Sequence, residues 1–386
     1  MKTYSCVLLL SVLYGLFSCT NQTSSSSKTP LTLKEAYKDK FLIGTALNTD
    51  HTNGSEKSTS LLIEEQFNTI VAENCMKPEE VHPSENIYDF RKADQFVEYG
   101  EKHNMFIVGH TLIWHSQVPD WFFENEDGTT CSRERLIERM REHIYTVVGR
   151  YKGRIHAWDV VNEAIDDLEG LRKSKWYQII GEDYIELAFQ FAHEADPNAE
   201  LYYNDYSLIL SHRREEAVKL IKKLQEKEIK VDGIGMQAHY GLDYVKIPDF
   251  ERSITEFSAL NIKVMLTELD ISVLPFPTEK ISAEISQKYE MLPEYNPYTD
   301  TLPDSIQQQL AQNYVDLFKV LLKYEDKVSR ITFWGVNDEH SWRNDWPIEG
   351  RTDHPLLFDR NNQPKEAYYS IIELGEAANN TKKQVL

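Results

Sequence analysis

The sequence predicts an α/β protein folded as a single (β/α)8 barrel, a TIM barrel, and three observations lead to that prediction. Eight short apolar runs, rich in Val, Ile, Phe and Tyr, recur along residues 41–338. Charged stretches with helical spacing lie between them, so strands and helices alternate as in a parallel sheet. Polar residues stand where the runs finish, and in this fold the carboxyl ends of the strands build the active site.

The predicted strands are residues 41–48, 67–74, 106–114, 155–163, 200–207, 233–240, 263–272 and 330–338. Between them, residues 132–152 and 213–227 place Leu, Ile and Val on one helical face and Arg, Glu and Lys on the other. That arrangement is typical of a helix in an outer layer. A doubly wound open sheet is the alternative, but no Gly-x-Gly-x-x-Gly motif follows the first strand. Because the repeat is continuous, we expect one catalytic domain over residues 31–386.

The first 30 residues have a different character. After Met1-Lys2 comes VLLLSVLYGLF, which is short for a membrane span and has the length of a signal-peptide core. It leads into Leu-Phe-Ser-Cys ending at Cys19, which resembles the bacterial lipobox, whose cysteine carries a lipid. We therefore expect a signal peptide over residues 1–18 and a Ser-rich tether over residues 19–30. The expectation is an exported lipoprotein of a Gram-negative bacterium, anchored at the outer membrane; a plain secretory signal is the alternative.

Composition excludes one class of partner and leaves others open. The formal net charge of −20 argues against nucleic acid, whose phosphates would be repelled. The 7 Trp, 21 Tyr and 16 Phe suit either a core or the stacking of sugar rings. Cys6 leaves with the signal peptide. Cys75 and Cys131 have no Cys-x-x-Cys spacing, so two free or buried thiols are expected, and a disulfide between them is the alternative.

Two glutamates, Glu163 and Glu268, lie on the fourth and seventh predicted strands. Cleavage of a glycosidic bond needs such a pair: one carboxyl protonates the leaving oxygen, and the other attacks the anomeric carbon or activates water. Either residue alone is equally well explained as a solvated strand end or a structural ion pair. Both together, on apolar strands among other polar strand ends, favour catalysis.

The histidines leave more than one interpretation open. The run HTLIWH, residues 110–115, fits neither the His-Glu-x-x-His helix nor a familiar zinc pattern. Strand alternation places His110 and His115 on opposite faces, so one of them is a candidate structural residue. His239 and Asp270 suit either an ion pair or the support of a catalytic group. A glycosidase carboxylate pair requires no metal and no cofactor.

At this point the chain resembles glycoside hydrolase family 10, the retaining endo-β-1,4-xylanases with a (β/α)8 fold. The matching segments follow one another in order: GTALN (44–48), ENCMKPE (73–79), GHTLIWHSQVPDW (109–121), WDVVNEAI (158–165), YYNDYS (202–207), GIGMQAHY (233–240), LTELDIS (266–272), FWGVND (333–338) and SW (341–342). The resemblance implies that Glu163 is the general acid and base and that Glu268 is the nucleophile.

The resemblance also implies substrate-binding or orienting roles for other residues. Around the substrate, the implied residues are Glu73, Asn74 and Lys77 for the sugar on the non-reducing side, His110 and Trp114 for the floor of the reacting subsite, and Trp334 and Trp342 for its aromatic wall. Tyr206 is implied for the leaving-group side, and Asn162 for the 2-hydroxyl of the reacting sugar. Beside the carboxyls, the resemblance implies that Gln237 lies close to the acid and that His239 with Asp270 orients the nucleophile.

The sequence therefore predicts a monomeric hydrolase that cleaves internal β-1,4-xylosidic linkages in xylan and xylo-oligosaccharides, with no cofactor. A β-1,4-glucanase of the same mechanism and a non-catalytic glycan-binding lipoprotein are the alternatives. The connection over residues 273–303 offers Tyr289, Tyr295 and Tyr298 for stacking. Connections of this length are often functional, and the sequence allows it either to line the cleft or to pack away from it.

Overall fold

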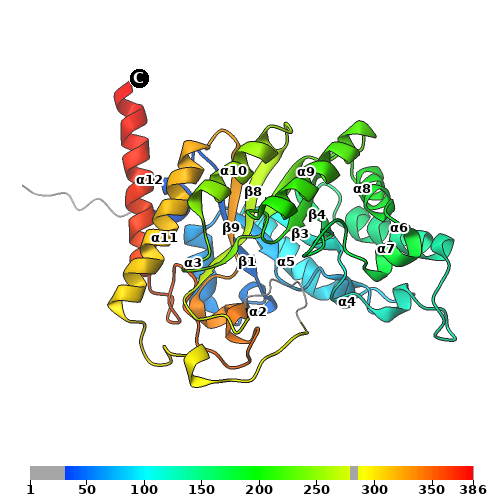
Figure 1. The fold of residues 1–386 in the computed structure, drawn as a ribbon, viewed down its shortest axis with the longest axis horizontal. Coiled ribbons are helices and arrows are strands. Elements are labelled where there is room, and N and C mark those ends of the chain that lie inside the picture. The colour runs from blue at the N-terminus through cyan, green and yellow to red at the C-terminus, as the bar shows by residue number, and fades with distance from the viewer. Residues whose placement is uncertain (1–30, 279–285, 386) are drawn as a thin grey trace, which may run out of the picture. The chain divides into compact units, whose positions relative to one another are not determined.

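The computed structural model describes residues 31–278 and 286–385; the predicted signal segment and Cys19 lie outside this range. Its strands are β1 (Leu42–Leu47), β2 (Thr69–Ala72), β3 (Phe106–Ile113), β4 (Ala157–Asn162), β5 (Glu200–Asp205), β6 (Gly233–Met236), β7 (His239–Gly241), β8 (Lys263–Ser272) and β9 (Val328–Phe333). All pairings between them are parallel, in the order β1-β2-β3-β4-β5-β6-β8-β9, and β9 pairs back with β1 (Figure 1). The predicted (β/α)8 barrel is confirmed.

Six predicted strands agree with the observed ones to within two residues at each end, and the other two differ more. The run 233–240 is broken, because Ala238 takes a left-handed backbone with φ of 67°. Consequently β6 stays in the ring, while the short β7 pairs only with the end of β8. The strand predicted over residues 330–338 lies nearer the N-terminus in the structure. β9 begins at Val328 and ends at Phe333, and residues 334–338 follow it.

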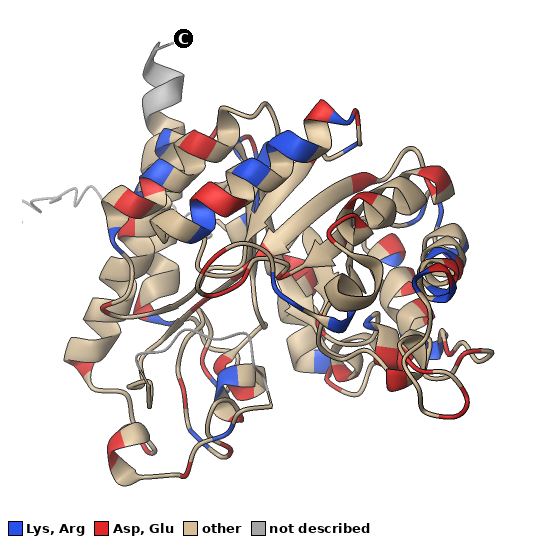
Figure 2. Cartoon of the chain, turned by 45° about the vertical axis from the view of Figure 1, so that its right-hand side comes forward, with Lys and Arg blue, Asp and Glu red and all other residues tan. Residues whose placement is uncertain are grey.

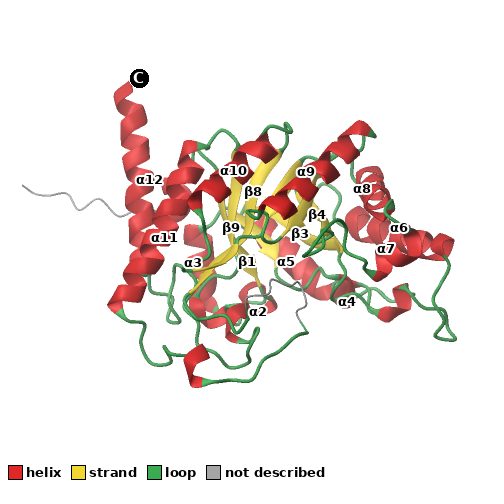
Figure 3. Ribbon diagram, viewed as in Figure 1, coloured by secondary structure: helices red, strands yellow, loops and turns green. Residues whose placement is uncertain are grey.

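Helices surround the strands, as Figure 3 shows. They are α1 (Leu33–Ala36), α2 (Thr49–Thr52), α3 (Lys57–Gln66), α4 (Pro78–Val81), α5 (Arg91–Lys102), η1 (Asp120–Phe122), α6 (Arg133–Arg150), α7 (Lys175–Ile180), α8 (Tyr184–Ala195), α9 (Ser211–Glu226), α10 (Ile247–Ser258), η2 (Pro293–Tyr295), α11 (Asp304–Lys323), η3 (Asp338–His340), η4 (Trp342–Asn344) and α12 (Glu366–Val385). In Figure 2 the charged residues gather on helices and loops, and the strands carry few. Within the described ranges, no helix combines the length and the apolar character needed to cross a bilayer.

The alternation of side chains along the strands produces two apolar layers. Ala46, Val71, Val108, Tyr202 and Met265 point into the barrel and pack on one another. Their strand neighbours point outward and form a larger core with the helices; this core includes Trp158, which is almost fully buried. The close approach of Trp158 leaves no room for a side chain at position 109, where a Cβ atom would lie 2.2 Å from the indole.

The two cysteines in the described part of the chain are both buried and unpaired. Cys75 and Cys131 are free thiols, as predicted. Burial raises the pKa of Cys75 to about 12, so its thiol stays protonated near neutral pH. A buried protonated thiol behaves as a small apolar side chain, and Cys75 therefore serves packing rather than chemistry.

Candidate active site

A cleft of about 650 Å³ lies where the barrel strands end, within the size range of ligand-binding pockets. The predicted site residues that line it are Glu73, Asn74, Lys77, His110, Trp114, Asn162, Glu163, Tyr206, Gln237, His239, Glu268, Trp334 and Trp342. Asp270 lies behind this surface and is fully buried. The loops after β1 and β2 carry α2 and α4, and residues 286–303 of the long connection after β8, drawn in yellow, run along the lower edge of Figure 1.

Glu163 follows the last residue of β4 and leaves the strand through a left-handed backbone, with φ of 57°. Such a conformation is uncommon for a residue with a side chain and marks a constrained position. Trp114 donates its indole N–H to Oε2 of Glu163 (2.8 Å), and Gln237 donates to Oε1 (2.9 Å). Burial, together with the charge of Glu268, raises the pKa of Glu163 although these hydrogen bonds oppose the shift. The carboxyl is thus suited to hold a proton.

Glu268 lies within β8, and its pKa is shifted in the opposite direction to that of Glu163. Asn204 donates its side-chain amide to Oε1 (2.7 Å), and Nε2 of His239 lies 3.2 Å from Oε2. Burial alone would raise the pKa of Glu268, but the bond from His239, the charges of His110 and His239 and the bond from Asn204 together lower it. The structure therefore favours an anion at Glu268, which is the form that a nucleophile requires.

The protonation of His239 depends on Asp270. Nδ1 of His239 lies 3.0 Å from Oδ2 of Asp270. Burial would lower the pKa of His239, but the charge of Asp270 and hydrogen bonds to both carboxylates raise it to about 9. Although burial would raise the pKa of Asp270, the charges of Arg343 and His239 and their hydrogen bonds lower it to about 2, so Asp270 stays ionised. Arg343 donates to it at 2.9 Å, and Trp342 donates at 2.7 Å. His239 is consequently a cation at neutral pH and stabilises the Glu268 anion.

Side-chain amides connect the two carboxyls. Strands β5 and β6 separate β4 from β8 in the ring, and each provides an amide: Asn204 from β5 and Gln237 from the residue after β6. Asn204 contacts the amide of Asn162 at 3.0 Å as well as Glu268, and Gln237 contacts Asn162 at 3.3 Å as well as Glu163. This chain of amides fixes the two carboxyls relative to each other, as paired catalysis requires.

The two histidines of HTLIWH do not lie on opposite faces of one strand, because β3 ends at Ile113. His110 lines the cleft, and its Nδ1 pairs with Asp159 at 2.9 Å. His115 lies in the loop beyond, with Nδ1 3.9 Å from Oε2 of Glu163. The predicted placement of His115 on the face opposite His110 is therefore wrong, since His115 lies beyond the strand and beside Glu163.

The polar end of the cleft is formed by the segment after β2. Lys77 is buried and donates to Asn74 (2.8 Å) and to Gln117 (2.6 Å). Burial lowers the pKa of Lys77 and raises that of the neighbouring Glu73, and each charge opposes the shift of the other. A compact group of donors and acceptors suits the hydroxyl groups of a sugar.

The connection after β8 lines the cleft, but its tyrosines do not. Leu274, Phe276, Thr278 and Lys288 are on the cleft surface, and Phe276 contacts Trp346 at a ring separation of 5.5 Å. The predicted stacking residues Tyr289, Tyr295 and Tyr298 are not on that surface, and Tyr298 packs on the core instead. The aromatic surface of this connection is therefore Phe276, which packs beside Trp346 of the loop after β9, and Trp346 in turn stacks on Trp342.

The structure adds residues whose roles the sequence did not assign. Asn204 and Gln117 stand inside recognisable motifs, and the position of Asn204 near the end of β5 was a further signal. Arg343 and Trp346 follow the last motif in an irregular loop, and Arg172 lies in the loop after β4. No spacing rule applies to loop residues of this kind, because only the fold brings them to the cleft.

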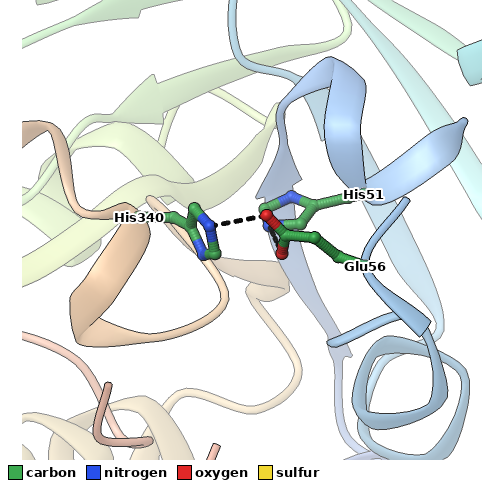
Figure 4. A group of neighbouring side chains, drawn as sticks. All are labelled: His51, Glu56 and His340. Atoms are coloured by element: carbon green, nitrogen blue, oxygen red, sulfur yellow. Dashed lines mark ion pairs between the residues drawn. The ribbon is translucent and has the colours of Figure 1, made fainter. Parts of the chain in front are cut away.

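Away from the cleft, His51, Glu56 and His340 form a group whose ligand atoms lie within 4.8 Å of one another (Figure 4). Nε2 of His340 lies 2.9 Å from Glu56. The backbone N–H of Asn48 donates to Nδ1 of His51 (3.2 Å), so neutral His51 carries its proton on Nε2, the atom that faces Glu56. A metal ion needs a lone pair on that nitrogen, and the hydrogen bonds therefore favour an ion-paired group that connects the loops after β1 and β9.

Comparison with known proteins agrees with this geometry. Residues 32–374 match glycosyl hydrolase family 10. The chain is 47% identical to endo-1,4-beta-xylanase A of Xylanibacter ruminicola, over 89% of this chain and 94% of that protein. A solved family 10 endoxylanase from a sugarcane soil metagenome is 46% identical, with a TM-score of 0.86 over 89% of this chain and 99% of that one.

A further solved structure was determined with a sugar bound. It is an intracellular xylanase of Thermoanaerobacterium saccharolyticum, a variant of which was solved in complex with xylotetraose. The two chains are 35% identical, with a TM-score of 0.77 over 88% of this chain and 98% of that one. With the family match spanning most of its length, the chain belongs to glycosyl hydrolase family 10.

Proposed function

We propose that this chain is a retaining endo-β-1,4-xylanase in which Glu163 is the general acid and base and Glu268 is the nucleophile. The observation that carries the assignment is the opposite shift of two buried carboxyls in one cleft: the pKa of Glu163 is raised and that of Glu268 is lowered. Pairs of carboxyls whose environments separate their pKa values are typical of acid and nucleophile in glycosidases. The named relatives, which are xylanases, support xylan as the substrate.

The reaction proceeds in two displacements. Glu163 gives its proton to the glycosidic oxygen while Glu268 attacks the anomeric carbon, so the C–O bond to the leaving sugar breaks and an ester forms. The ester removes the negative charge of Glu268, which had raised the pKa of Glu163. Glu163, now ionised, takes a proton from water, whose oxygen attacks the anomeric carbon and releases Glu268 as the anion. The product keeps the β configuration.

Product analysis tests the function directly. Polymeric xylan should lose viscosity well before reducing ends accumulate, because internal bonds are cleaved, and NMR spectroscopy should detect the β-anomer first. Cellulose should be a poor substrate. Faster hydrolysis of cellulose than of xylan would indicate a glucanase, initial α-anomer would indicate inversion, and binding of xylan without turnover would indicate a non-catalytic protein.

The pKa shifts predict the pH profile. Activity is lost when Glu268 gains a proton, so its lowered pKa places the acid limb of kcat/KM below the ordinary glutamate range. Activity is also lost when Glu163 loses its proton, so its raised pKa places the alkaline limb above that range. The profile on xylotetraose should be bell-shaped. A dinitrophenyl xylobioside, which needs no proton, should lose the alkaline limb; an identical limb on both substrates would contradict the roles.

Glu73 is expected to matter more for short substrates than for long ones. Removing a hydrogen bond to a charged group costs about 1.5–3 kcal/mol, so Glu73→Ala should lower kcat/KM on xylotriose by about 10- to 100-fold. Polymeric xylan should lose less than about 3-fold, because other subsites hold the chain. Glu80→Gln, which alters a carboxyl paired with Lys92 outside the cleft, is the matched control. Equal losses on both substrates would refute this placement of Glu73.

We further propose that the chain is exported and attached through a lipid on Cys19 to the outer membrane of a Gram-negative cell, as a monomer with residues 31–386 as its catalytic domain. The Leu-Phe-Ser-Cys motif and the Ser-rich segment after it support this proposal. Cys19→Ala should move the protein from the membrane fraction to the soluble fraction with unchanged specific activity. Cys6→Ala, on the other side of the cleavage site, should remain with the membranes. Retention of Cys19→Ala on the membranes would contradict the anchor.

A further inference from the structure

The loop after β4 turns back on itself beside the catalytic acid. Ile165 and Leu171 form an isolated antiparallel bridge, and the backbone N–H of Arg172 donates to the carbonyl of Ala164 (2.7 Å). The tip of the loop is solvent-exposed, with Leu168 85% exposed. This short reversal returns the chain to its starting point, so Arg172, nine positions after Glu163, lies next to it.

The guanidinium of Arg172 holds the turn at Glu163. Its Nε donates to the backbone carbonyl of Glu163 (3.0 Å), and its Nη2 donates to the carbonyl of Ile165 (3.2 Å). These carbonyls flank Ala164, where the chain leaves the left-handed conformation of Glu163. A left-handed non-glycine residue costs about 1–3 kcal/mol and persists only when its surroundings fix it. On the other side, the backbone N–H of Glu163 donates to the backbone carbonyl of Asn204 (2.9 Å).

The same guanidinium also reaches the wall of the cleft. Nη2 of Arg172 donates to the hydroxyl of Tyr206 (2.8 Å), and that hydroxyl also bonds to Asp167. The guanidinium carbon of Arg213 lies over the Tyr206 ring, 3.9 Å from its centre. Tyr206 lines the cleft, whereas Arg172 is not on the cleft surface. Arg172 therefore contacts the backbone of Glu163 and the hydroxyl of Tyr206, but it does not lie on the surface that would contact substrate.

We propose that Arg172 is a positioning residue for proton donation: it fixes the backbone turn of Glu163 and the ring of Tyr206 together, so that the acid is aimed at the oxygen of the leaving sugar. This inference rests on the proposed role of Glu163. Proton transfer requires the donor and acceptor oxygens to be within hydrogen-bond distance, and a shift of the turn would move the carboxyl away. The charge of Arg172 additionally lowers the pKa of Glu163, against the effect of burial.

The test compares leaving groups. General acid catalysis contributes about 10²- to 10⁴-fold, and Arg172→Met should forfeit part of it, lowering kcat/KM on xylotetraose by roughly 10- to 100-fold. On a dinitrophenyl xylobioside, whose leaving group departs without a proton, the loss should stay below about 3-fold. A residue needed only for folding would lower both values alike. Arg133→Met, which removes an arginine bonded to Ile180 and Asp183 outside the cleft, should change neither.

The pH profile provides a second readout. Arg172→Met removes a positive charge that lowers the pKa of Glu163, so the alkaline limb on xylotetraose should move to higher pH. Arg172→Lys retains the charge but lacks the forked donor, so it should lose activity on xylotetraose with the limb in place. Arg172→Lys also allows the two substrates to be compared if Arg172→Met does not fold. Equal losses on both substrates, or an unmoved limb in folded Arg172→Met, would overturn the inference. If Glu163→Ala itself failed to discriminate between the substrates, the proposed function would fall instead.

Discussion

Glu163→Ala is expected to lower kcat/KM on xylan by about 10²- to 10⁴-fold, the range that general acid catalysis contributes. A sugar alkoxide is a poor leaving group and departs only when its oxygen is protonated. Glu163 provides that proton, since burial and the charge of Glu268 raise its pKa and disfavour its anion. Without the carboxyl, the cleft retains the nucleophile but has no donor at the leaving oxygen.

An activated substrate separates this loss from a loss of folding. With a dinitrophenyl xylobioside, Glu163→Ala should still form the glycosyl-enzyme, which accumulates because no base activates water. A rapid burst of dinitrophenol and a mass increase of one xylobiosyl unit on the protein would show the intermediate. Azide, which needs no base, should enter the vacated space, restore turnover and give a β-glycosyl azide.

Glu256→Gln is the matched control for the change of charge. Its carboxyl pairs with Arg214 between α9 and α10, outside the cleft, and its loss should leave both substrates unaffected. If Glu163→Ala showed no burst with the activated substrate while azide yielded the α-product, Glu163 would be the nucleophile and the assignment would be reversed.

The parts of the site that lie on strands or directly after them were predictable from sequence. Apolar runs of the right length predict strands, and a strand in a parallel barrel has one functional end, so Glu163 and Gln237 were expected near the same rim. The left-handed turn at Ala238 was not predictable, because the sequence shows no glycine where the chain leaves β6. It separates β7 from β6 and is therefore part of what places His239 beside Glu268.

Loop residues were predictable only where a motif included them. Arg343 donates to Asp270 and lowers the pKa of that carboxyl. It lies, however, in the segment after β9, where no strand pattern predicts its position. The tyrosines at positions 289 and 295 were plausible stacking residues by composition, but the path of the loop puts Phe276 on the cleft instead. Side-chain type suggests what a loop residue can bind, whereas the path of its backbone decides whether it reaches the site.

Glu268→Gln is expected to abolish hydrolysis of every substrate, by on the order of 10⁶-fold, as when a hydrolase loses its nucleophile. An amide cannot form the glycosyl ester, so an activated leaving group gives no advantage. This distinguishes the variant from Glu163→Ala, in which the first step survives. The smaller Glu268→Ala leaves space beneath the anomeric carbon, and azide should then attack an activated substrate directly from the opposite face, giving an α-glycosyl azide.

The electrostatic consequences of Glu268→Gln provide a readout that does not depend on turnover. The charge of Glu268 raises the pKa of Glu163 and, with Asp270, that of His239. Removing it should lower both pKa values, which NMR titration of labelled glutamate and histidine side chains would detect. In Glu256→Gln the pKa values of Glu163 and His239 should be unchanged, because the Glu256 carboxyl pairs with Arg214 outside the cleft. Because Nε2 of His239 lies 3.2 Å from Oε2 of Glu268, the fall should be clearest at His239. Turnover of xylan by Glu268→Gln at a rate near that of Glu256→Gln would remove Glu268 from the mechanism.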